Sequence, residues 1–322
     1  STAVTGGMTL ISRITGLVRD VVFAGLIGAS ANIAADAFYV AFRIPNFFRR
    51  IFGEGAFSQA FVPVLTEHKV RTSPEETRAF VDHVAGRFGA ILFIVTLIGV
   101  LAAPIFVMIL APGWFIEKPD KFELTVQMLR IMFPYLMFVS LVAMAAGILN
   151  SYGKFGVAAF TPVLLNLCLI GAALWLAPYM EKPVVGLAWG VFLAGVVQLI
   201  FQIPFLRRIR MLPRPRLKPA HDGAGRVFKL MLPAIFGVSV SQINLLVNTL
   251  LASFLVTGSV SWLYYSDRLM EFPLGVFGIA LATVILPSLS HKHATNSHEE
   301  FSQLLDWALR WVVLIGLPAS VA

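Results

Sequence analysis

Hydrophobic residues along this chain fall in runs of about 20 or more, separated by short polar segments, which is the pattern of membrane-spanning helices. Turn-rich segments at 67–78, 111–114 and 150–154 lie between the longest runs. The runs predict helices over 2–28, 33–65, 80–110, 122–149, 157–176, 184–206, 227–256 and 260–289, with a ninth beginning near residue 301. We therefore expect an all-α protein that crosses a membrane many times.

Composition supports an integral membrane protein. Hydrophobic residues make up 58% of the 322 residues and charged residues only 13%, whereas soluble domains average about 45–50% and about 25%. The single cysteine, Cys168, excludes an internal disulfide framework. The first apolar run continues past Arg13 without a small-residue cleavage pattern, so we expect no cleaved signal peptide. We attribute the net charge of +8 to the loops rather than to a nucleic-acid partner.

The loops carry their positive charge unevenly. Those after the second, fourth, sixth and eighth predicted helices hold eleven lysines and arginines, while the opposing loops hold only Lys118, Lys121 and Lys182. Lysine and arginine are retained on the cytoplasmic side of a membrane. The sequence therefore predicts a cytoplasmic N-terminus and a cytoplasmic linker over 207–221.

The sequence also contains an internal repeat with an offset of 225 residues. Tyr39, Arg43, Ile44, Phe47, Phe52 and Gly53 reappear as Tyr264, Arg268, Leu269, Phe272, Phe277 and Gly278. Parallel repeats are typical of transporters whose substrate site lies between the repeats. We expect a six-helix lobe over 1–210, a basic linker over 211–225 and the start of a second lobe over 226–322. Because the second lobe would need as many helices as the first, we expect a chain truncated in that lobe.

Charged residues inside the predicted helices point to the site. The run from Ala34 to Leu65 contains five of them, and a charge near the bilayer centre costs about 2.5–3.5 kcal/mol on insertion scales, so such residues usually face a cavity or a partner. A kink at Pro45 would free backbone groups that a water-filled interior could satisfy. The five are Asp36, Arg43, Arg49, Arg50 and Glu54. We therefore expect a cationic, water-filled chamber within the membrane.

Arginines of the first helix belong to the same hypothesis. Arg13 lies about 16 Å along a helix that starts near Thr2, at about 1.5 Å per residue, which is too deep for easy snorkelling to the headgroups. We therefore expect Arg13 and Arg19 to face the chamber. For Arg49 and Arg50 the residues leave two readings open, a chamber role or an anchor at the cytoplasmic rim.

A compact charged set lies in the eighth predicted helix, where Asp267, Arg268 and Glu271 are spaced for one helix face. One reading is a self-neutralising structural pair; Asp36 and Glu54 could likewise neutralise nearby arginines. The other reading is recognition of a phosphate or a carboxylate, because planar guanidinium groups bind such anions in a bidentate manner.

The sequence lacks the motifs of several enzyme classes. It contains no P-loop, no GxSxG motif, no dinucleotide fingerprint and no histidine spacing typical of a zinc site. We expect a transporter rather than an enzyme, with no cofactor and no metal site, driven by a gradient, the membrane potential or substrate flow.

Four segments resemble the MurJ family, the bacterial lipid II flippases of the MOP exporter superfamily. They cover 12–20 (SRITGLVRD), 36–64 (DAFYVAFRIPNFFRRIFGEGAFSQAFVPV), 237–243 (GVSVSQI) and 266–273 (SDRLMEFP). The resemblance implies a MOP-type pair of six-helix lobes in the bacterial cytoplasmic (inner) membrane. It also implies alternating access that moves lipid II, an undecaprenyl-pyrophosphate-linked peptidoglycan precursor, from the cytoplasmic to the periplasmic leaflet, by a protein that we expect to be a monomer.

The family's functional residues carry over to matching positions of this chain. Its central arginines match Arg13, Arg19, Arg49 and Arg268, and its cavity acids match Asp36, Glu54, Asp267 and Glu271. The choice of Arg49 over Arg50 follows from the resemblance alone. Some relatives place a sodium site on helices beyond those of this chain, so the coupling ion, sodium or proton, stays open.

Two other functions remain as alternatives. A cation-coupled multidrug exporter, or an exporter of another lipid-linked oligosaccharide, would share the superfamily fold; a cationic drug, however, would favour an acid-lined chamber over an excess of arginine. A membrane-embedded glycosyl or phosphoryl transferase would need a base and a metal-binding acidic pair, which Asp36 and Glu54 do not clearly supply.

Overall fold

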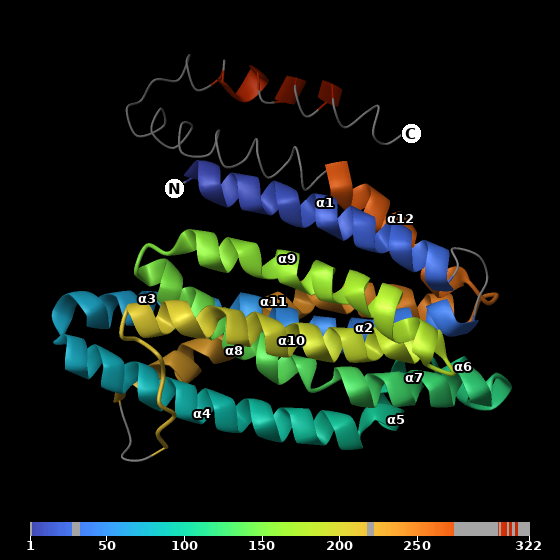
Figure 1. Cartoon of the computed structure of the whole chain (residues 1–322), viewed down its shortest axis with the longest axis horizontal. Coiled ribbons are helices and arrows are strands. Elements are labelled where there is room, and N and C mark those ends of the chain that lie inside the picture. The colour runs from blue at the N-terminus through green and yellow to red at the C-terminus, as the bar shows by residue number, and fades with distance from the viewer. Residues whose placement is uncertain are drawn as a thin grey trace. The chain divides into compact units, whose positions relative to one another are not determined.

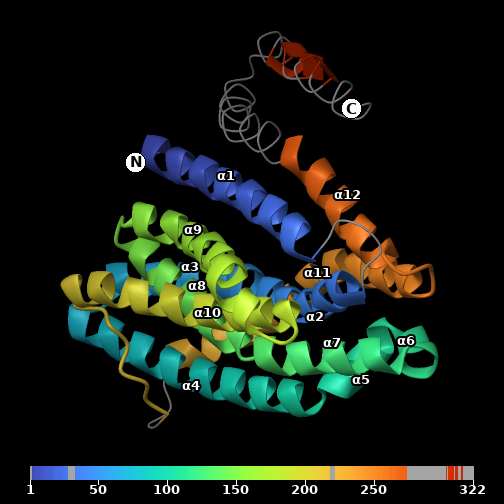
Figure 2. The same cartoon turned by 45° about the vertical axis from the view of Figure 1, so that its right-hand side comes forward.

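The computed structural model describes residues 2–27, 33–217 and 222–273, together with 302, 304–307, 309–310 and 313–314. The chain separates into two compact units, Ser1–Ser261 and Trp262–Ala322, and each is described here by itself. In the first unit, long helices lie side by side and account for nearly all the described residues (Figures 1 and 2). The described part of the chain contains no strand, in agreement with the predicted all-α class.

The elements follow the predicted hydrophobic runs. They are α1 (Thr2–Ile27), α2 (Ile33–Arg49), the π-helical segment η1 (Arg50–Gly55), α3 (Ala56–Arg71), α4 (Pro74–Leu101), α5 (Ala103–Leu110), α6 (Pro112–Glu117), α7 (Pro119–Met132), α8 (Tyr135–Ser151), α9 (Phe155–Gly171), the π-helical segment η2 (Ala172–Leu176), the short 3-10 helix η3 (Ala177–Tyr179), α10 (Pro183–Arg208), α11 (Asp222–Ser253) and α12 (Ser259–Pro273). The rest of the helix predicted over 260–289 lies outside the described residues. Near the predicted ninth helix, only the isolated residues given above are described, and these are helical.

Local sequence sets the connections. Ser73 caps α4: its hydroxyl accepts the Glu76 amide at 3.2 Å, the Glu76 carboxylate accepts the Ser73 amide at 3.2 Å, and Pro74 occupies the first turn. The predicted turn at 150–154 contains Gly153 at a φ of 75°, a conformation that glycine adopts without strain.

The second predicted helix differs from expectation. It continues to Arg71 rather than ending near residue 65, and its helical regularity changes at η1 rather than at Pro45, which lies buried within α2. Over Arg50–Gly55 the backbone is π-helical, a form defined by hydrogen bonds between residues i and i+5. Such π-helical segments often occur at functional sites. The helix predicted over 80–110 likewise begins earlier, at Pro74, and divides into α4 and α5.

The main hydrophobic core joins α3, α4, α8 and α11. The Phe57 and Phe88 rings stack with centroids 3.9 Å apart, and Ala224, Val227 and Met231 of α11 are buried in the same cluster. The contacts therefore group α11 with the first six predicted helices. The predicted lobes of 1–210 and 226–322 stay a prediction.

Within the residues that the structure describes, five helical segments are long and apolar enough to cross a membrane. They are Pro74–Leu101, Pro119–Ser151, Phe155–Tyr179, Pro183–Arg208 and Gly223–Val240. Neither α1 nor α2, which carry the predicted site residues, is among them.

Candidate functional site

Asp36 lies in the first turn of α2 and is the centre of a dense polar cluster, which we call the Asp36 clasp. The residue is 1% exposed. Its Oδ2 atom lies 2.7 Å from Lys121 Nζ and accepts the Gly258 amide at 2.7 Å. Its Oδ1 atom accepts the Ser261 amide at 2.9 Å and the Ser261 hydroxyl at 2.6 Å. Four donors thus satisfy one buried carboxylate.

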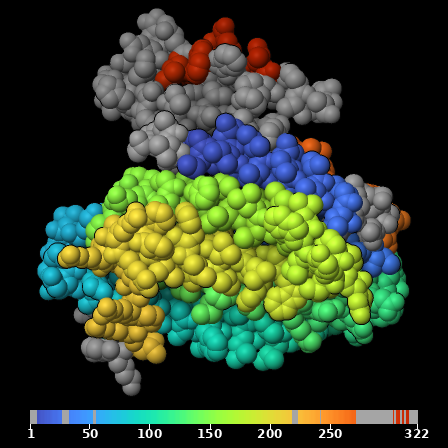
Figure 3. Space-filling view, in the orientation of Figure 1, coloured from blue at the N-terminus to red at the C-terminus, as the bar shows by residue number. Residues whose placement is uncertain are grey.

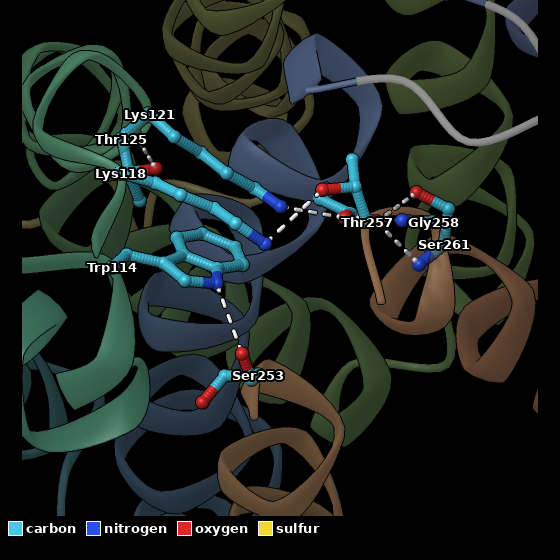
Figure 4. Close-up of polar contacts among 9 residues, drawn as sticks. Trp114, Lys118, Lys121, Thr125, Ser253, Thr257, Gly258 and Ser261 are labelled. Atoms are coloured by element: carbon cyan, nitrogen blue, oxygen red, sulfur yellow. Dashed lines mark hydrogen bonds and ion pairs between the residues drawn. The ribbon is translucent and has the colours of Figure 1, made fainter. Parts of the chain in front are cut away.

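Residues of α6 and α7 complete the clasp (Figure 4). The Lys121 ammonium lies 3.9 Å from the centroid of the Trp114 ring, whose indole N–H donates to the Ser253 carbonyl at 3.2 Å. Lys118 Nζ donates to Thr257 Oγ1 at 3.2 Å. The clasp therefore ties α2, α6 and α7 to residues 253–261, which connect α11 to α12.

The geometry explains why the cluster is stable without solvent. The side chains of Asp36 and Lys121 are each 1% exposed, and a buried ion pair is tolerated only when the remaining hydrogen-bonding capacity is satisfied. The amide of Ser261 belongs to the first turn of α12, where a carboxylate is favoured by the helix dipole. Gly258 has a φ of 105°, which turns the chain so that its amide reaches Asp36.

Two expectations change at this point. Asp36 was predicted to line a cavity, but its carboxylate is enclosed by Lys121, Gly258 and Ser261. Lys121 was counted as a loop lysine, yet it is a buried residue of α7, since that helix begins at Pro119. Pro119 is the first residue of this helix, a position that proline favours because its missing N–H is not needed there.

Arg19 lies at the contact between α1 and α9 and is 6% exposed. Its Nε and one terminal nitrogen bond to Asp20 Oδ1 at 2.9 and 2.5 Å, and its other terminal nitrogen donates to Asn166 Oδ1 at 3.1 Å. The Asn166 amide in turn donates to the Ser12 carbonyl at 3.0 Å. The guanidinium is therefore held in a fixed orientation, with its charge compensated by Asp20.

The arginines of the long second helix point to different partners. Arg43 donates to the Leu245 carbonyl at 2.9 Å and Arg50 to Gln242 Oε1 at 3.2 Å, and both acceptors belong to α11. The Nε of Arg49 donates to Asn46 Oδ1 at 2.9 Å within α2. Arg43 and Arg50 thus connect α2 and η1 to α11, whereas the Arg49 bond stays within its own helix.

The structure says less about the remaining predicted site residues. Arg13 is half-buried on α1, and within the described ranges it makes no hydrogen bond or ion pair. Glu54 lies in η1 and Glu271 in α12, but their side chains are outside what the structure describes. Asp267 and Arg268 are half-buried on α12 and belong to the second unit, so they are described apart from the other arginines.

Sequence reasoning missed three partners in these clusters. Asn166 and Trp114 stand among apolar residues, and a single polar or aromatic residue in such a run does not reveal what it contacts. Ser261 lies 225 residues after Asp36, the offset of the internal repeat, which was the one available signal.

Among the described residues, no group of three or more His, Cys, Asp or Glu is placed to hold a metal ion. A shallow recess of about 430 Å³ on α7 contains none of the predicted arginines and is lined by Phe122, Glu123, Val126, Gln127, Arg130 and Ile131.

Comparison with known sequences gives close matches. A family profile described as "Lipid II flippase MurJ" matches residues 23–322. The chain is 52% identical to a "Probable lipid II flippase MurJ" of Vibrio cholerae, over 99% of this chain and 61% of the relative. It is 46% identical to the "Lipid II flippase MurJ" of Burkholderia cenocepacia, over 98% of this chain and 61% of the relative. The chain thus spans about three fifths of the length of these relatives.

Solved structures agree with the fold. One titled "Lipid II flippase MurJ, inward closed conformation" matches with a TM-score of 0.79 at 28% identity, covering 98% of this chain and 63% of that one. An inward-facing multidrug resistance MATE transporter of the MOP superfamily matches with a TM-score of 0.71 at 15% identity, covering 95% of this chain and 68% of that one. The second match shows the fold alone.

Proposed function

Because this chain belongs to the MurJ family of lipid II flippases, we propose that it is the part of a flippase that grips lipid II and closes one end of the transport path. The family and the apolar helices make it a multi-pass protein of a bacterial inner membrane. The transported substrate is lipid II, carried from the cytoplasmic to the periplasmic leaflet. The protein works as a monomer and without a covalent intermediate.

The observation that carries the mechanism is the Asp36 clasp. Alternating access requires a contact that closes one end of the path and can be broken without unfolding a helix. The clasp fits this requirement, since its bonds run from side chains of α2, α6 and α7 to the short turn before α12. Separating the two sides exposes Asp36 and Lys121 to water, which solvates both charges and lowers the cost of opening.

Arginines are proposed to hold the substrate. A pyrophosphate is a dianion that hydrocarbon excludes, and guanidinium groups in a wet cavity replace its hydration. We assign this role to Arg13, Arg19, Arg49 and Arg268. Asp20 and Asn166 orient Arg19, whereas Arg13 has no partner within the described ranges and is available to an anion.

Acids set the net charge of the proposed chamber. Glu54, Asp267 and Glu271 are proposed to line it, while Asp36 acts in the clasp. An inside-negative membrane potential favours return of the empty cationic site to the cytoplasmic side. The polyprenyl tail stays in lipid throughout the cycle.

Transport of fluorescent lipid II in proteoliposomes tests the proposal. Arg268→Ala should abolish translocation while leaving insertion and thermal stability close to those of the wild type. Arg19→Ala should abolish translocation too, but at a cost in thermal stability, because buried Asp20 loses its counter-charge; its insertion and folding are therefore measured alongside transport. Arg71→Ala is the control, because Arg71 is an exposed arginine paired with Glu67 on one helix face, and it should transport normally. Wild-type flux in Arg19→Ala or Arg268→Ala would remove that arginine from the site.

A further inference from the structure

The linker that follows α10 does not leave the protein surface at once. The chain turns at Arg210, which has a φ of 57°, and the Met211 amide donates to the Leu206 carbonyl at 3.0 Å. The Met211 side chain is 5% exposed and joins the core built from α3, α4 and α11. Residues 211–217 then run without helical structure across α4 (Figure 1).

Asp82 of α4 holds this segment at two points. Its Oδ1 atom accepts the Arg214 amide at 2.7 Å, and its backbone carbonyl accepts the Arg216 amide at 3.0 Å. Oδ2 lies 3.7 Å from Arg216 Nε. Asp82 is 3% exposed although it is an acid, and both its carboxylate and its backbone carbonyl bind the linker.

Gly86, one turn further along α4, provides the space for the linker backbone. A Cβ atom at this position would lie 2.3 Å from the Arg216 carbonyl oxygen and 2.7 Å from its nitrogen. Both atoms belong to the main chain, so a side chain at Gly86 cannot be accommodated by a rotamer change. A Cβ at Gly89 on the same helix would meet nothing within 4 Å.

We propose that residues 211–217 form a strap, fastened to α4 by Asp82 and Gly86, that shortens the tether between the first six helices and α11. Unfastened, the fourteen steps from Arg208 to Asp222 could span roughly 48 Å at about 3.4 Å per residue. Fastened, only the five steps from Leu217 to Asp222 remain, or roughly 17 Å. Figure 3 shows the yellow-orange surface of the linker lying against the blue-green surface of α4.

The first turn of α11, which follows the linker directly, lies against α3 and α4. Gly223 packs against His68 and Phe80, and Arg226 pairs with Glu67 of α3 at 2.8 Å. The ion pair is more than half exposed on the arginine side, so by itself it holds the helices weakly. Ala224 and Val227 of the same part of α11 also pack in the core shared with α3. The strap therefore limits how far the first turn of α11 can move from α3 once this packing opens in the lobe movement of the proposed function, on which this part of the proposal rests.

Limited trypsin digestion of the purified protein in nanodiscs tests the fastening. The Arg214–Pro215 bond resists trypsin, so the Arg216–Leu217 bond is the readout, detected by mass spectrometry as a new N-terminus at Leu217. Asp82→Ala and Gly86→Ala should each speed this cleavage about tenfold or more, because either change favours local opening of the strap. Asp82→Asn keeps an oxygen acceptor for the Arg214 amide and should lie between wild type and Asp82→Ala.

The matched control is Gly89→Ala, the same substitution on the same helix with open space around it, which should be cleaved at the wild-type rate. Equal cleavage of Gly86→Ala, Gly89→Ala and wild type would overturn the proposed fastening. If Asp82→Ala does not yield folded protein, the Gly86 and Gly89 pair decides the question. If Gly86→Ala also fails to fold, Asp82→Asn takes its place against Gly89→Ala.

Spin labels at Thr66 of α3 and Lys229 of α11, in a Cys168→Ser background, test the tether. Both positions are exposed. The wild type should give a narrow distance distribution, and Gly86→Ala or Asp82→Asn should add a longer component. Faster cleavage of the strap with an unchanged distance distribution would refute the tether while leaving the fastening in place.

Discussion

At the scale of single residues, Asp36 and Lys121 form a buried ion pair. Both side chains are 1% exposed, and the carboxylate accepts three further hydrogen bonds. Removing one partner of a buried pair leaves an uncompensated charge, whereas replacing both partners is often nearly neutral. The two cases can be separated by experiment.

Lys121→Met should lower the free energy of unfolding by about 3–5 kcal/mol, because Asp36 then loses its counter-charge in a buried site. The double variant Asp36→Asn/Lys121→Met should recover much of this loss, since asparagine keeps an acceptor for Ser261. Arg71→Met removes an exposed pair with Glu67 and should cost under about 1 kcal/mol. Thermal unfolding in nanodiscs measures all three; an additive double variant would argue against the ion pair.

Asn166→Leu should destabilise the protein by about 1–3 kcal/mol, because it removes the side-chain oxygen to which the buried Arg19 guanidinium donates. It should also reduce lipid II translocation through Arg19. Gln127→Leu is the control, since Gln127 is an exposed amide on α7. Normal transport by Asn166→Leu would show that Arg19 needs no support from α9.

The sequence predicted which charged residues are unusual but not which residues they contact. The cost of a charge in the membrane identified Arg19 and Asp36 as special positions, because that cost depends on residue type and depth alone. It did not identify Lys121 or Asn166 as their partners, since a contact between residues 85 or 147 positions apart is set by helix packing. A buried charged residue could therefore be identified from the sequence without the residue that orients it.

At the scale of elements, η1 is where α2 meets α11. A Cβ at Gly55 would lie 2.5 Å from the Arg50 carbonyl oxygen and 2.8 Å from a methyl of Val238 on α11. The wide backbone turns of η1 and the close approach of α11 thus require the same glycine. Arg50, in the same segment, donates to Gln242 of α11.

Gly55→Ala should therefore lower the thermal unfolding midpoint and weaken transport, because either η1 or α11 must move. Gly237→Ala is the matched control on α11, where a Cβ would meet nothing within 4 Å. The control should be neutral or stabilise by up to about 1 kcal/mol, the usual gain from replacing a helical glycine. Equal stability of the two variants would mean that the contact at Gly55 has no energetic weight.

Helix positions were predicted well because a run of apolar residues specifies a span regardless of its neighbours. The points at which a helix is interrupted were not predicted. The change to η1 and the division between α4 and α5 at Leu101–Ala103 depend on packing that hydropathy does not encode. Pro45 was the obvious place for a kink, but it is accommodated within α2.

At the scale of the whole molecule, the Asp36 clasp and the internal repeat are related. Asp36 and Ser261 are separated by the repeat offset of 225 residues, so the clasp joins equivalent positions of the two repeats. The offset of the sequence repeat therefore coincides with the separation of the two ends of this contact.

Asp36→Cys/Ser261→Cys should form a disulfide under mild oxidation, because the side chains of Asp36 and Ser261 are in direct contact, with Asp36 Oδ1 and Ser261 Oγ 2.6 Å apart. Oxidation should stop lipid II translocation in this variant, and reduction should restore whatever activity the reduced variant has. Each single cysteine variant serves as the control and should not respond to oxidation. Unchanged transport after complete cross-linking would show that the clasp stays closed throughout the cycle.

The orientation of the helices gives the last prediction. The continuous helical stretch from Ile33 to Arg71 is about 58 Å long at about 1.5 Å per residue, which is longer than a bilayer is thick, so we expect its two ends on opposite sides of the membrane. Asp36 is at one end, and Arg71 is at the other, next to the start of α4. The finding that Lys121 is buried leaves only Lys118 and Lys182 of the three opposing lysines available as topological charges. The contrast between the two faces thus increases, which favours a cytoplasmic linker.

Single cysteines at Glu75 and Glu181, in a Cys168→Ser background, measure this orientation in intact cells whose outer membrane has been permeabilised. A charged maleimide that cannot cross the inner membrane should label the cysteine at Glu181, which follows η3 at the clasp end, and should label that at Glu75 only after lysis. The reverse pattern would place the clasp on the cytoplasmic face. Since the clasp is closed in this structure, the expected pattern means that the periplasmic end is sealed here, and that the sealed state is the one poised to receive substrate from the cytoplasmic leaflet.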